Sequence, residues 1–146
     1  MLCNISKVFE RAIYNVLYLY LTENNLLNPK NAGFKKGDST VNQLLYITDK
    51  ISSSMDQGKE VRMVFLDAAK AFDKVWHRGL LFKLRQLGIT PEFVNWFASY
   101  LSHRKQCVVI NGASSPTLSI EAGVPQGSIL GPLLFLVHVN DITNKV

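Results

Sequence analysis

Apolar residues recur at helical spacing over the first part of the chain, and this pattern predicts an amphipathic helix. Asn4 or Ser6 is the expected N-terminal cap, because short polar side chains can accept a backbone hydrogen bond there. The polar pair Asn24-Asn25 is expected to end the helix, and Pro29 opposes its continuation. The apolar stripe consists of Ile5, Val8, Phe9, Ala12, Ile13, Val16, Leu17, Tyr20 and Leu21.

A second helix is expected to begin near Ser39, after a polar loop that contains two glycines and two lysines. Asp56-Gln57-Gly58 then has the composition of a turn. The nearly continuous apolar run from Val61 to Leu66 follows, and its branched side chains predict a strand that is buried on both faces. The apolar face of the second helix would hold Val41, Leu44, Leu45, Thr48, Ile51 and Met55.

Glycine and proline divide the next part of the chain into two helices. Gly88 is expected to end a helix over Gly79–Leu87, while Thr90 caps the following helix and Pro91 takes its first position. In the helix that begins at Pro91, the apolar residues are spaced as in a helix that packs into a core, and not as a platform for base stacking. They are Phe93, Val94, Trp96, Phe97, Tyr100 and Leu101.

The last third of the chain mixes strands and a helix. Strands are predicted over Gln106–Ile110 and Leu118–Glu121, with Asn111-Gly112 as the turn. A glycine-rich loop then leads to a helix that Ser128 would cap and that would extend to Val139. Because the chain shows no regular β-α-β alternation, the predicted fold class is α+β.

Composition adds limits to this picture. The 146 residues are 47% hydrophobic and 18% charged, which is typical of a globular domain and argues against disorder. A net charge of +5 fits either a nucleic-acid or nucleotide partner or an ordinary basic protein. The two cysteines lie far apart and the histidines are scattered, so neither a zinc site nor a disulfide framework is expected. The N-terminal apolar run is too short to cross a membrane and lacks a cleavage site, so an intracellular, nuclear or cytoplasmic protein is expected.

Two segments carry candidate chemistry. Asp67 comes directly after the predicted buried strand, and a carboxylate there could bind magnesium or cap the next element. In the second segment, Gly123 and Gly127 would let the backbone approach a ligand closely, and Gln126 can both donate and accept hydrogen bonds. The loop precedes a helix N-terminus, which favours phosphate, although a tight turn would explain it equally well.

Together and in this order, the two segments resemble reverse transcriptases, specifically those of LINE-like non-LTR retrotransposons. The resemblance covers essentially the whole chain, because two upstream segments also match the family's early fingers helix and its glycine-rich loop. The matching segments are FLD at Phe65–Asp67, KAFD at Lys70–Asp73, VWH at Val75–His77, GVPQGS at Gly123–Ser128, LGPLLF at Leu130–Phe135, Asn140-Asp141, Ile5–Arg11 and Gly33–Thr40.

The resemblance implies part of a right-hand polymerase, with fingers-like residues at about 1–59 and an incomplete palm at about 60–146. The complete parent would be an RNA-directed DNA polymerase that adds deoxynucleotides to a primer by two-metal phosphoryl transfer. Its implied partners are an RNA template, a DNA primer and a deoxynucleoside triphosphate. Its implied cofactor is Mg²⁺, with Mn²⁺ as an alternative.

The resemblance also assigns roles to individual residues. Asp67 would be a catalytic ligand of magnesium, and the backbone carbonyl of Ala68 a further ligand. Phe72 would lie against the sugar and exclude a 2′-hydroxyl, unless it is simply a core aromatic on a short helix. Gln126 and Gly127 would pack beneath the nucleotide and the template base.

Basic residues in two places are candidate contacts of nucleotide or nucleic acid. Lys35 and Lys36 match fingers positions near the triphosphate or the template. Lys35 replaces the family's usual arginine and so loses bidentate phosphate geometry, and Asp38 stands where arginine is common. Arg104 and Lys105 could contact a nucleic-acid backbone. A solvated loop face is the competing interpretation at both places.

Other acidic residues are not expected to complete the metal site. Asp73 is expected to cap a helix or to pair with Lys74 or Arg78, and Asp141 to belong to a helix end. The chain contains no Asp-Asp pair, so the polypeptide alone is expected to lack polymerase activity. The alternative function is a non-catalytic remnant that binds nucleic acid or a protein partner. An unpaired edge at Val61–Leu66 is expected to promote aggregation and lower stability.

Overall fold

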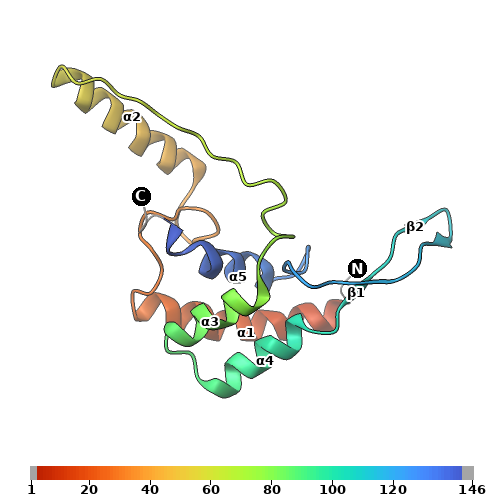
Figure 1. Cartoon of the computed structure of the whole chain (residues 1–146). Helices are drawn as coiled ribbons and strands as arrows, with labels where there is room; N and C mark the ends of the chain where they lie inside the picture. Colours follow the sequence, from red (N-terminus) through yellow and green to blue (C-terminus); the bar gives the residue numbers. More distant parts are fainter. Residues whose placement is uncertain (1–2, 143–146) are drawn as a thin grey trace.

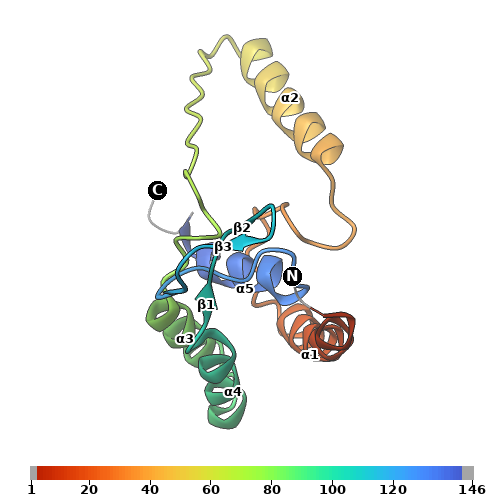
Figure 2. The ribbon, with the colours of Figure 1, turned by 90° about the vertical axis from the view of Figure 1, so that its right-hand side faces the viewer.

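Helices form a body from which one helix projects, in a computed structural model that describes residues 3–142. Figure 1 shows most of the helices packed together and one standing apart from them. Figure 2, turned by 90°, shows the same separation, with an extended chain returning beside α2. The body consists of α1 (Asn4–Glu23), α3 (His77–Gln86), α4 (Pro91–Leu101) and α5 (Leu130–Val139), and the projecting helix is α2 (Thr40–Asp56).

The core of the body forms around α5. This helix has the sequence LGPLLFLVHV, which is apolar on all sides, and such a helix is stable only when neighbours cover it. It contacts α1 and α3, and α3 in turn contacts α4. The fully buried side chains are contributed by all four helices and by Val75, which lies just before α3. They include Leu17, Leu21, Val75, Leu80, Leu84, Val94, Phe97, Leu130, Leu134 and Val137.

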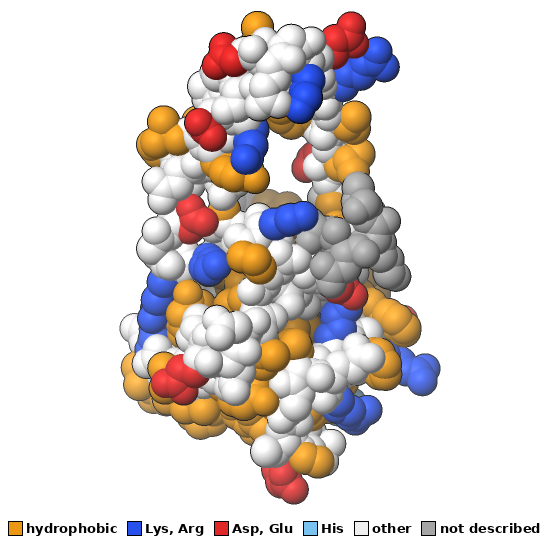
Figure 3. Space-filling model, turned by 90° about the vertical axis from the view of Figure 1, so that its left-hand side faces the viewer, with side chains coloured by type: hydrophobic (Ala, Val, Ile, Leu, Met, Phe, Trp, Pro, Cys, Tyr) orange, Lys and Arg blue, Asp and Glu red, His pale blue; other side chains and the backbone are white. Residues whose placement is uncertain are grey.

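The segment from 28 to 74 contributes no buried residue to this core. The predicted helix near Ser39 is confirmed as α2, and the Ser39 hydroxyl accepts a hydrogen bond from the Asn42 backbone N–H at 3.1 Å. Its apolar face is nevertheless exposed, because α2 makes no extensive contact with another helix and none of its residues is buried. Figure 3 shows an opening between the body and the projecting part of the chain that carries α2, with hydrophobic side chains exposed around the opening.

The predicted buried strand at Val61–Leu66 is wrong. The run is extended but unpaired, and Val64, Phe65 and Leu66 are 83%, 82% and 92% exposed. An extended segment becomes a strand only when a neighbour pairs with its N–H and C=O groups. No strand lies beside this run within residues 3–142. That the run promotes aggregation stays a prediction.

The two predicted strands near the C-terminal third are confirmed as a broken hairpin. β1 (Lys105–Gln106) pairs antiparallel with β4 (Leu118–Ser119), and β2 (Val109–Ile110) pairs antiparallel with β3 (Ala113–Ser114). The turn at Asn111-Gly112 has positive φ at both residues, 49° and 82°, as a two-residue hairpin turn requires. This mixture of helices and small strands agrees with the α+β prediction.

The helix boundaries follow the local signals of the sequence, with two corrections at the N-terminal caps. α1 is capped by Cys3, whose sulfur accepts from the Ser6 N–H at 3.5 Å, and not by Asn4 or Ser6. Asn24 ends α1 as predicted. Thr90 occupies the N-cap position of α4 with Pro91 after it, but its side chain makes no capping hydrogen bond. Within residues 3–142, no helix combines the length and the apolar character that crossing a bilayer requires.

Candidate functional site

The two segments singled out by the sequence lie side by side in the structure. The backbone N–H of Val124 donates to the carbonyl of Phe72 at 2.9 Å, and that of Gly123 donates to the carbonyl of Val75 at 2.8 Å. The His77 ring nitrogen Nε2 lies 2.7 Å from the Gly123 carbonyl oxygen. Backbone and side-chain contacts therefore fix the Gly123–Ser128 loop against the Phe72–Val75 segment. We call this contact between the two segments the junction.

Gly123 is required at the junction for two reasons. Its φ of +93° lies in the region that favours glycine. A Cβ at this position would also lie 2.8 Å from the carbonyl oxygen of Asp73. Gly127 shares the positive φ, at +76°, but a Cβ there would meet nothing within 4 Å. The loop is thus pressed against its neighbour at its start and open to solvent at its end.

Gln126 and Asp73 connect the two segments through their side chains. The Gln126 Nε2 donates to Asp73 Oδ1 at 2.8 Å. The expected partners of Asp73, Lys74 and Arg78, are wrong: within the described chain neither forms an ion pair with it. Because Nε2 is engaged, the amide oxygen of Gln126 remains as the acceptor that this side chain can offer to a ligand.

Phe72 lies in an aromatic cluster that connects three parts of the sequence. Its ring stacks on Phe135 of α5, with centroids 4.6 Å apart and planes at 27°. Phe34, from the Gly33–Thr40 segment that leads into α2, contacts Phe72 edge-on, with ring centroids 5.5 Å apart. Phe72 is half-buried, and its segment is a turn rather than the short helix of the alternative interpretation. The ring is therefore held in place beside the junction.

Glu10 is a residue of the site region that sequence reasoning missed. Its carboxylate is 2% exposed and accepts from the backbone N–H groups of Ile129 at 2.7 Å and Leu130 at 3.4 Å. It also accepts from the Tyr100 hydroxyl at 2.9 Å, and burial together with this hydrogen bond raises the pKa of Tyr100. A signal in the sequence could have identified Glu10, because it is an acidic residue among the apolar residues of α1. A charge that is buried with such neighbours needs hydrogen-bond partners.

Glu10 and Ser128 together satisfy the first N–H groups of α5. The Ser128 hydroxyl accepts from the Gly131 N–H at 2.8 Å, so the capping role predicted for Ser128 is confirmed, although Ile129 occupies the N-cap position. The same hydroxyl donates to the Pro125 carbonyl at 2.7 Å. A carboxylate from a distant helix and a local hydroxyl therefore fix the exit of the glycine-rich loop.

Asp67 is not held by a sheet, contrary to the prediction. It and Ala68 are exposed on the extended segment that leads from α2 to the junction. A carboxylate and a backbone carbonyl are hard oxygen donors that suit magnesium, which takes one or two carboxylates and completes its shell with water or phosphate. Residues 3–142 gather no group of three or more potential metal ligands. The fit is therefore that of a partial ligand set.

The candidate basic contacts lie in separate places. Lys35 is half-buried and Lys36 is exposed in the loop before α2. Arg104 lies over the Tyr100 ring at 5.9 Å, and Lys105 is exposed in β1. Asp141 follows α5, as expected, and pairs with Lys83. Lys36 lies over the Tyr14 and Tyr18 rings of α1, whereas Arg104 lies over the Tyr100 ring of α4, so these two cations contact different aromatic rings.

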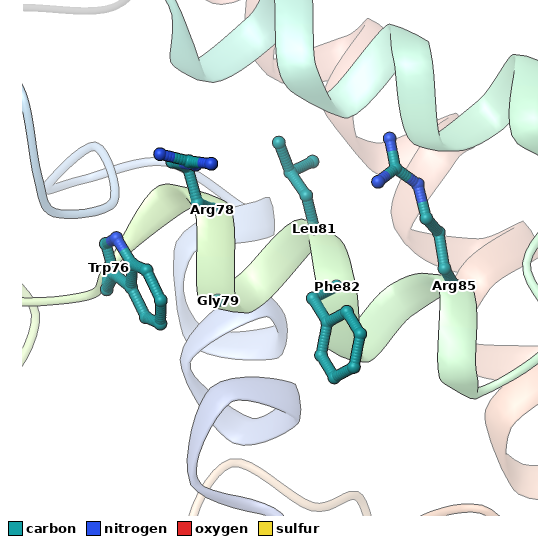
Figure 4. Close-up of a pocket in the computed structure, with 6 residues that line it drawn as sticks. All are labelled: Trp76, Arg78, Gly79, Leu81, Phe82 and Arg85. Atoms are coloured by element: carbon teal, nitrogen blue, oxygen red, sulfur yellow. The ribbon is translucent and has the colours of Figure 1, made fainter.

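A further hollow lies on the outer side of α3. It is lined by Trp76, Arg78, Gly79, Leu81, Phe82 and Arg85. Figure 4 shows Arg78, Leu81 and Arg85 projecting from one side of the helix while Phe82 points away from them. The Trp76 ring packs over Gly79, where an added Cβ would collide with ring atom Cε3. The hollow therefore presents two arginines that lie outside the junction.

Comparison with known proteins places these features in a family context. The family model "Reverse transcriptase (RNA-dependent DNA polymerase)" matches residues 1–146. "Probable RNA-directed DNA polymerase from transposon BS" of Drosophila melanogaster is 39% identical over 142 residues, which are 97% of this chain and 16% of that protein. "RNA-directed DNA polymerase from mobile element jockey" of Drosophila melanogaster is 34% identical over 142 residues, 97% of this chain and 15% of that protein.

A third relative extends the similarity to another group of elements. The "Retrovirus-related Pol polyprotein from type-1 retrotransposable element R2" of Popillia japonica is 31% identical over 139 residues, 94% of this chain and 20% of that protein. The chain thus spans 15 to 20% of the length of these three relatives. No solved structure matches it.

Proposed function

The chain belongs to the reverse transcriptase (RNA-dependent DNA polymerase) family, and from this premise we propose that it serves RNA-directed DNA synthesis by a non-LTR retrotransposon. The proposed role is to supply a metal-binding carboxylate and the nucleotide side of the polymerase site. The observation that carries the proposal is the junction, at which Phe72 and Gln126 come from separate segments that backbone hydrogen bonds hold together.

The proposed cofactor is Mg²⁺, with Mn²⁺ as the alternative. Asp67 and the Ala68 carbonyl would contribute two oxygen ligands, and residues outside 3–142 or the substrate phosphates would complete the shell. When bound, the ion would stabilise the charge that develops as a phosphoryl group is transferred. The exposure of Asp67 suits this role, because its carboxylate oxygens are accessible to an ion and to substrate phosphates.

The residues of the junction would select and orient the nucleotide. In this proposal the Phe72 ring, held by Phe135 and Phe34, lies against the sugar and leaves no room for a 2′-hydroxyl. The Gln126 amide oxygen would accept a hydrogen bond from the substrate, and Gly127 would let the loop lie close to it. Lys35 would contribute positive charge towards a triphosphate. The proposed partners are an RNA template, a DNA primer and deoxynucleoside triphosphates.

A chimeric polymerase tests the proposal. Residues 3–142 would replace the matching segment of the jockey polymerase of Drosophila melanogaster, and primer extension on an RNA template would be measured with Mg²⁺. We expect Asp67→Asn to abolish extension, because the amide is a much weaker metal ligand. Asp56→Asn, at the exposed end of α2, is the matched control and should leave extension unchanged.

Two outcomes would count against this function. If Asp67→Asn and Asp56→Asn extended the primer at the same rate, Asp67 would not be a metal ligand. The second outcome is a folded chimera that shows no extension under conditions in which the jockey polymerase is active. That result would favour a non-catalytic piece that binds nucleic acid.

A further inference from the structure

Two cations converge on one aromatic stack at the edge of α1. Tyr14 and Tyr18 stack with ring centroids 5.5 Å apart and planes at 8°. The Arg11 guanidinium carbon lies 5.5 Å from the Tyr14 centroid. The Lys36 ammonium lies 5.7 Å from the same centroid and 5.0 Å from that of Tyr18. Each cation is attracted to the ring faces, and the stack thereby fixes both charges in one place.

The stack also attaches the loop before α2 to the body. The Lys36 backbone N–H donates to the Tyr18 hydroxyl at 3.0 Å. Two residues earlier in the same loop, Phe34 contacts Phe72 at 5.5 Å. The basic stack, by which we mean Arg11, Tyr14, Tyr18 and Lys36, therefore belongs to a connected surface that includes the aromatic cluster at the junction.

In the part of the chain that the structure describes, no ion pair neutralises the charges of the basic stack. Neither Arg11 nor Lys36 has a carboxylate within 4.0 Å among residues 3–142. The neighbouring carboxylate, that of Glu10, is buried and engaged by Ile129 and Tyr100. Lys7 precedes Arg11 by about one helical turn and adds a third cation to this side of α1. Like charges held together without a counter-ion favour an anionic ligand.

We propose that the basic stack binds the backbone phosphates of a single-stranded RNA. Arg11 and Lys36 would each contact a phosphate, and the tyrosine stack would hold the two cations at a fixed separation. The choice of RNA rests on the proposed function, since the family name specifies an RNA-dependent polymerase. A nucleotide triphosphate offers the same phosphate chemistry, and competition separates the two sources.

Fluorescence anisotropy with the full 146-residue chain and a labelled oligouridine tests this site. Arg11→Gln combined with Lys36→Gln should weaken binding about tenfold at moderate salt, because two phosphate contacts and their counter-ion release are lost. The dependence of log affinity on log salt should become shallower by about 1.4, since each contact to a single strand contributes about 0.7.

The hollow on α3 provides a matched control. Arg78→Gln combined with Arg85→Gln removes the same net charge from exposed positions outside the basic stack, and should change affinity less than twofold. Arg11→Lys combined with Lys36→Arg keeps both charges and should retain binding, which separates loss of charge from loss of packing. Circular dichroism and thermal melting should show that each variant folds like the parent chain.

Three results would overturn the site. Equal weakening by the two double variants would mean that only net charge matters, and no weakening by either would mean that the basic stack is not used. Excess deoxynucleoside triphosphate could displace the RNA from the parent chain but not from the Arg11→Gln, Lys36→Gln variant. That result would assign the site to the nucleotide instead of the RNA. Because Asp67→Asn should bind RNA like the parent chain, failure of this inference is distinguishable from failure of the catalytic proposal.

Discussion

The Glu10 carboxylate accepts a hydrogen bond from the backbone N–H of Ile129 at 2.7 Å, although the two residues lie at opposite ends of the sequence. The bond connects the middle of α1 to the first turn of α5, directly after the glycine-rich loop. A negative charge is favourable there, because unpaired N–H groups and the helix dipole meet at a helix N-terminus. The position of the loop therefore depends on a residue that has no chemistry of its own in the site.

Glu10→Ala should lower the free energy of unfolding by about 3 kcal/mol, because it leaves buried backbone N–H groups and the Tyr100 hydroxyl without an acceptor. Glu10→Gln keeps an acceptor oxygen and should fall between Glu10→Ala and the parent chain. Urea denaturation followed by circular dichroism measures both. Glu23→Ala, at the exposed end of α1, is the control. Equal stability of Glu10→Ala and Glu23→Ala would contradict the role of this hydrogen-bond network.

Gly123→Ala should destabilise the chain more than Gly127→Ala. Both substitutions place a side chain at positive φ, which costs about 1–2 kcal/mol. Gly123→Ala adds a clash with the Asp73 backbone, worth about 1–3 kcal/mol more. Thermal and urea unfolding of the two variants isolate the contact from the backbone strain. If the two losses were the same, the close approach at the junction would not matter for stability.

Asp73 and Gln126 should show a favourable coupling in a double-mutant cycle. Asp73→Ala, Gln126→Ala and the double variant should give a coupling free energy of about 0.5–1.5 kcal/mol, the range for one exposed hydrogen bond. A second cycle with Asp73→Ala and Lys74→Ala serves as the control and should give a value near zero. The opposite ranking of the two cycles would restore Lys74 as the partner of Asp73.

Stability should fall as the pH decreases below the ordinary pKa of histidine. Burial lowers the pKa of His138 from its usual 6.5, the charge of Lys83 lowers it further, and Asp141 opposes this. Below pH 6.5 the unfolded chain takes up a proton that folded His138 does not, so protonation favours unfolding. Melting temperatures measured from about pH 7 to about pH 5 should fall less for His138→Gln than for the parent chain. A parallel fall in both would exclude His138 as the cause.

Helices could be predicted well from the sequence, because their signals are local. The stripe of α1, the Ser39 cap of α2 and the Gly88-to-Pro91 boundary each depend on residues within a few turns of one another. The prediction of a strand at Val61–Leu66 was wrong for the opposite reason, because pairing depends on residues far away in the sequence. An apolar run shows that a segment can be buried, but a strand also needs a distant partner, and the run itself does not reveal one.

The site shows the same division between local and distant information. The motifs identified Asp67, Phe72 and Gln126 as candidates, and the roles assigned to them remain predictions. Proximity in the sequence predicts Lys74 or Arg78 as the partner of Asp73, whereas the structure supplies Gln126 from a distant loop. Glu10 was overlooked because the groups it satisfies are backbone N–H groups, which carry no mark in a sequence.

The contact between Phe34 and Phe72 closes a long excursion of the chain. Everything buried lies outside residues 28–74, so α2 and the extended run behind it add nothing to the core of the body. Loop closure depends only weakly on loop length. The segment between Phe34 and Phe72 is therefore the place where this chain can gain or lose residues, or be cut by a protease, while the body keeps its fold. The contact between the Phe34 and Phe72 rings would still hold the two ends of this segment together.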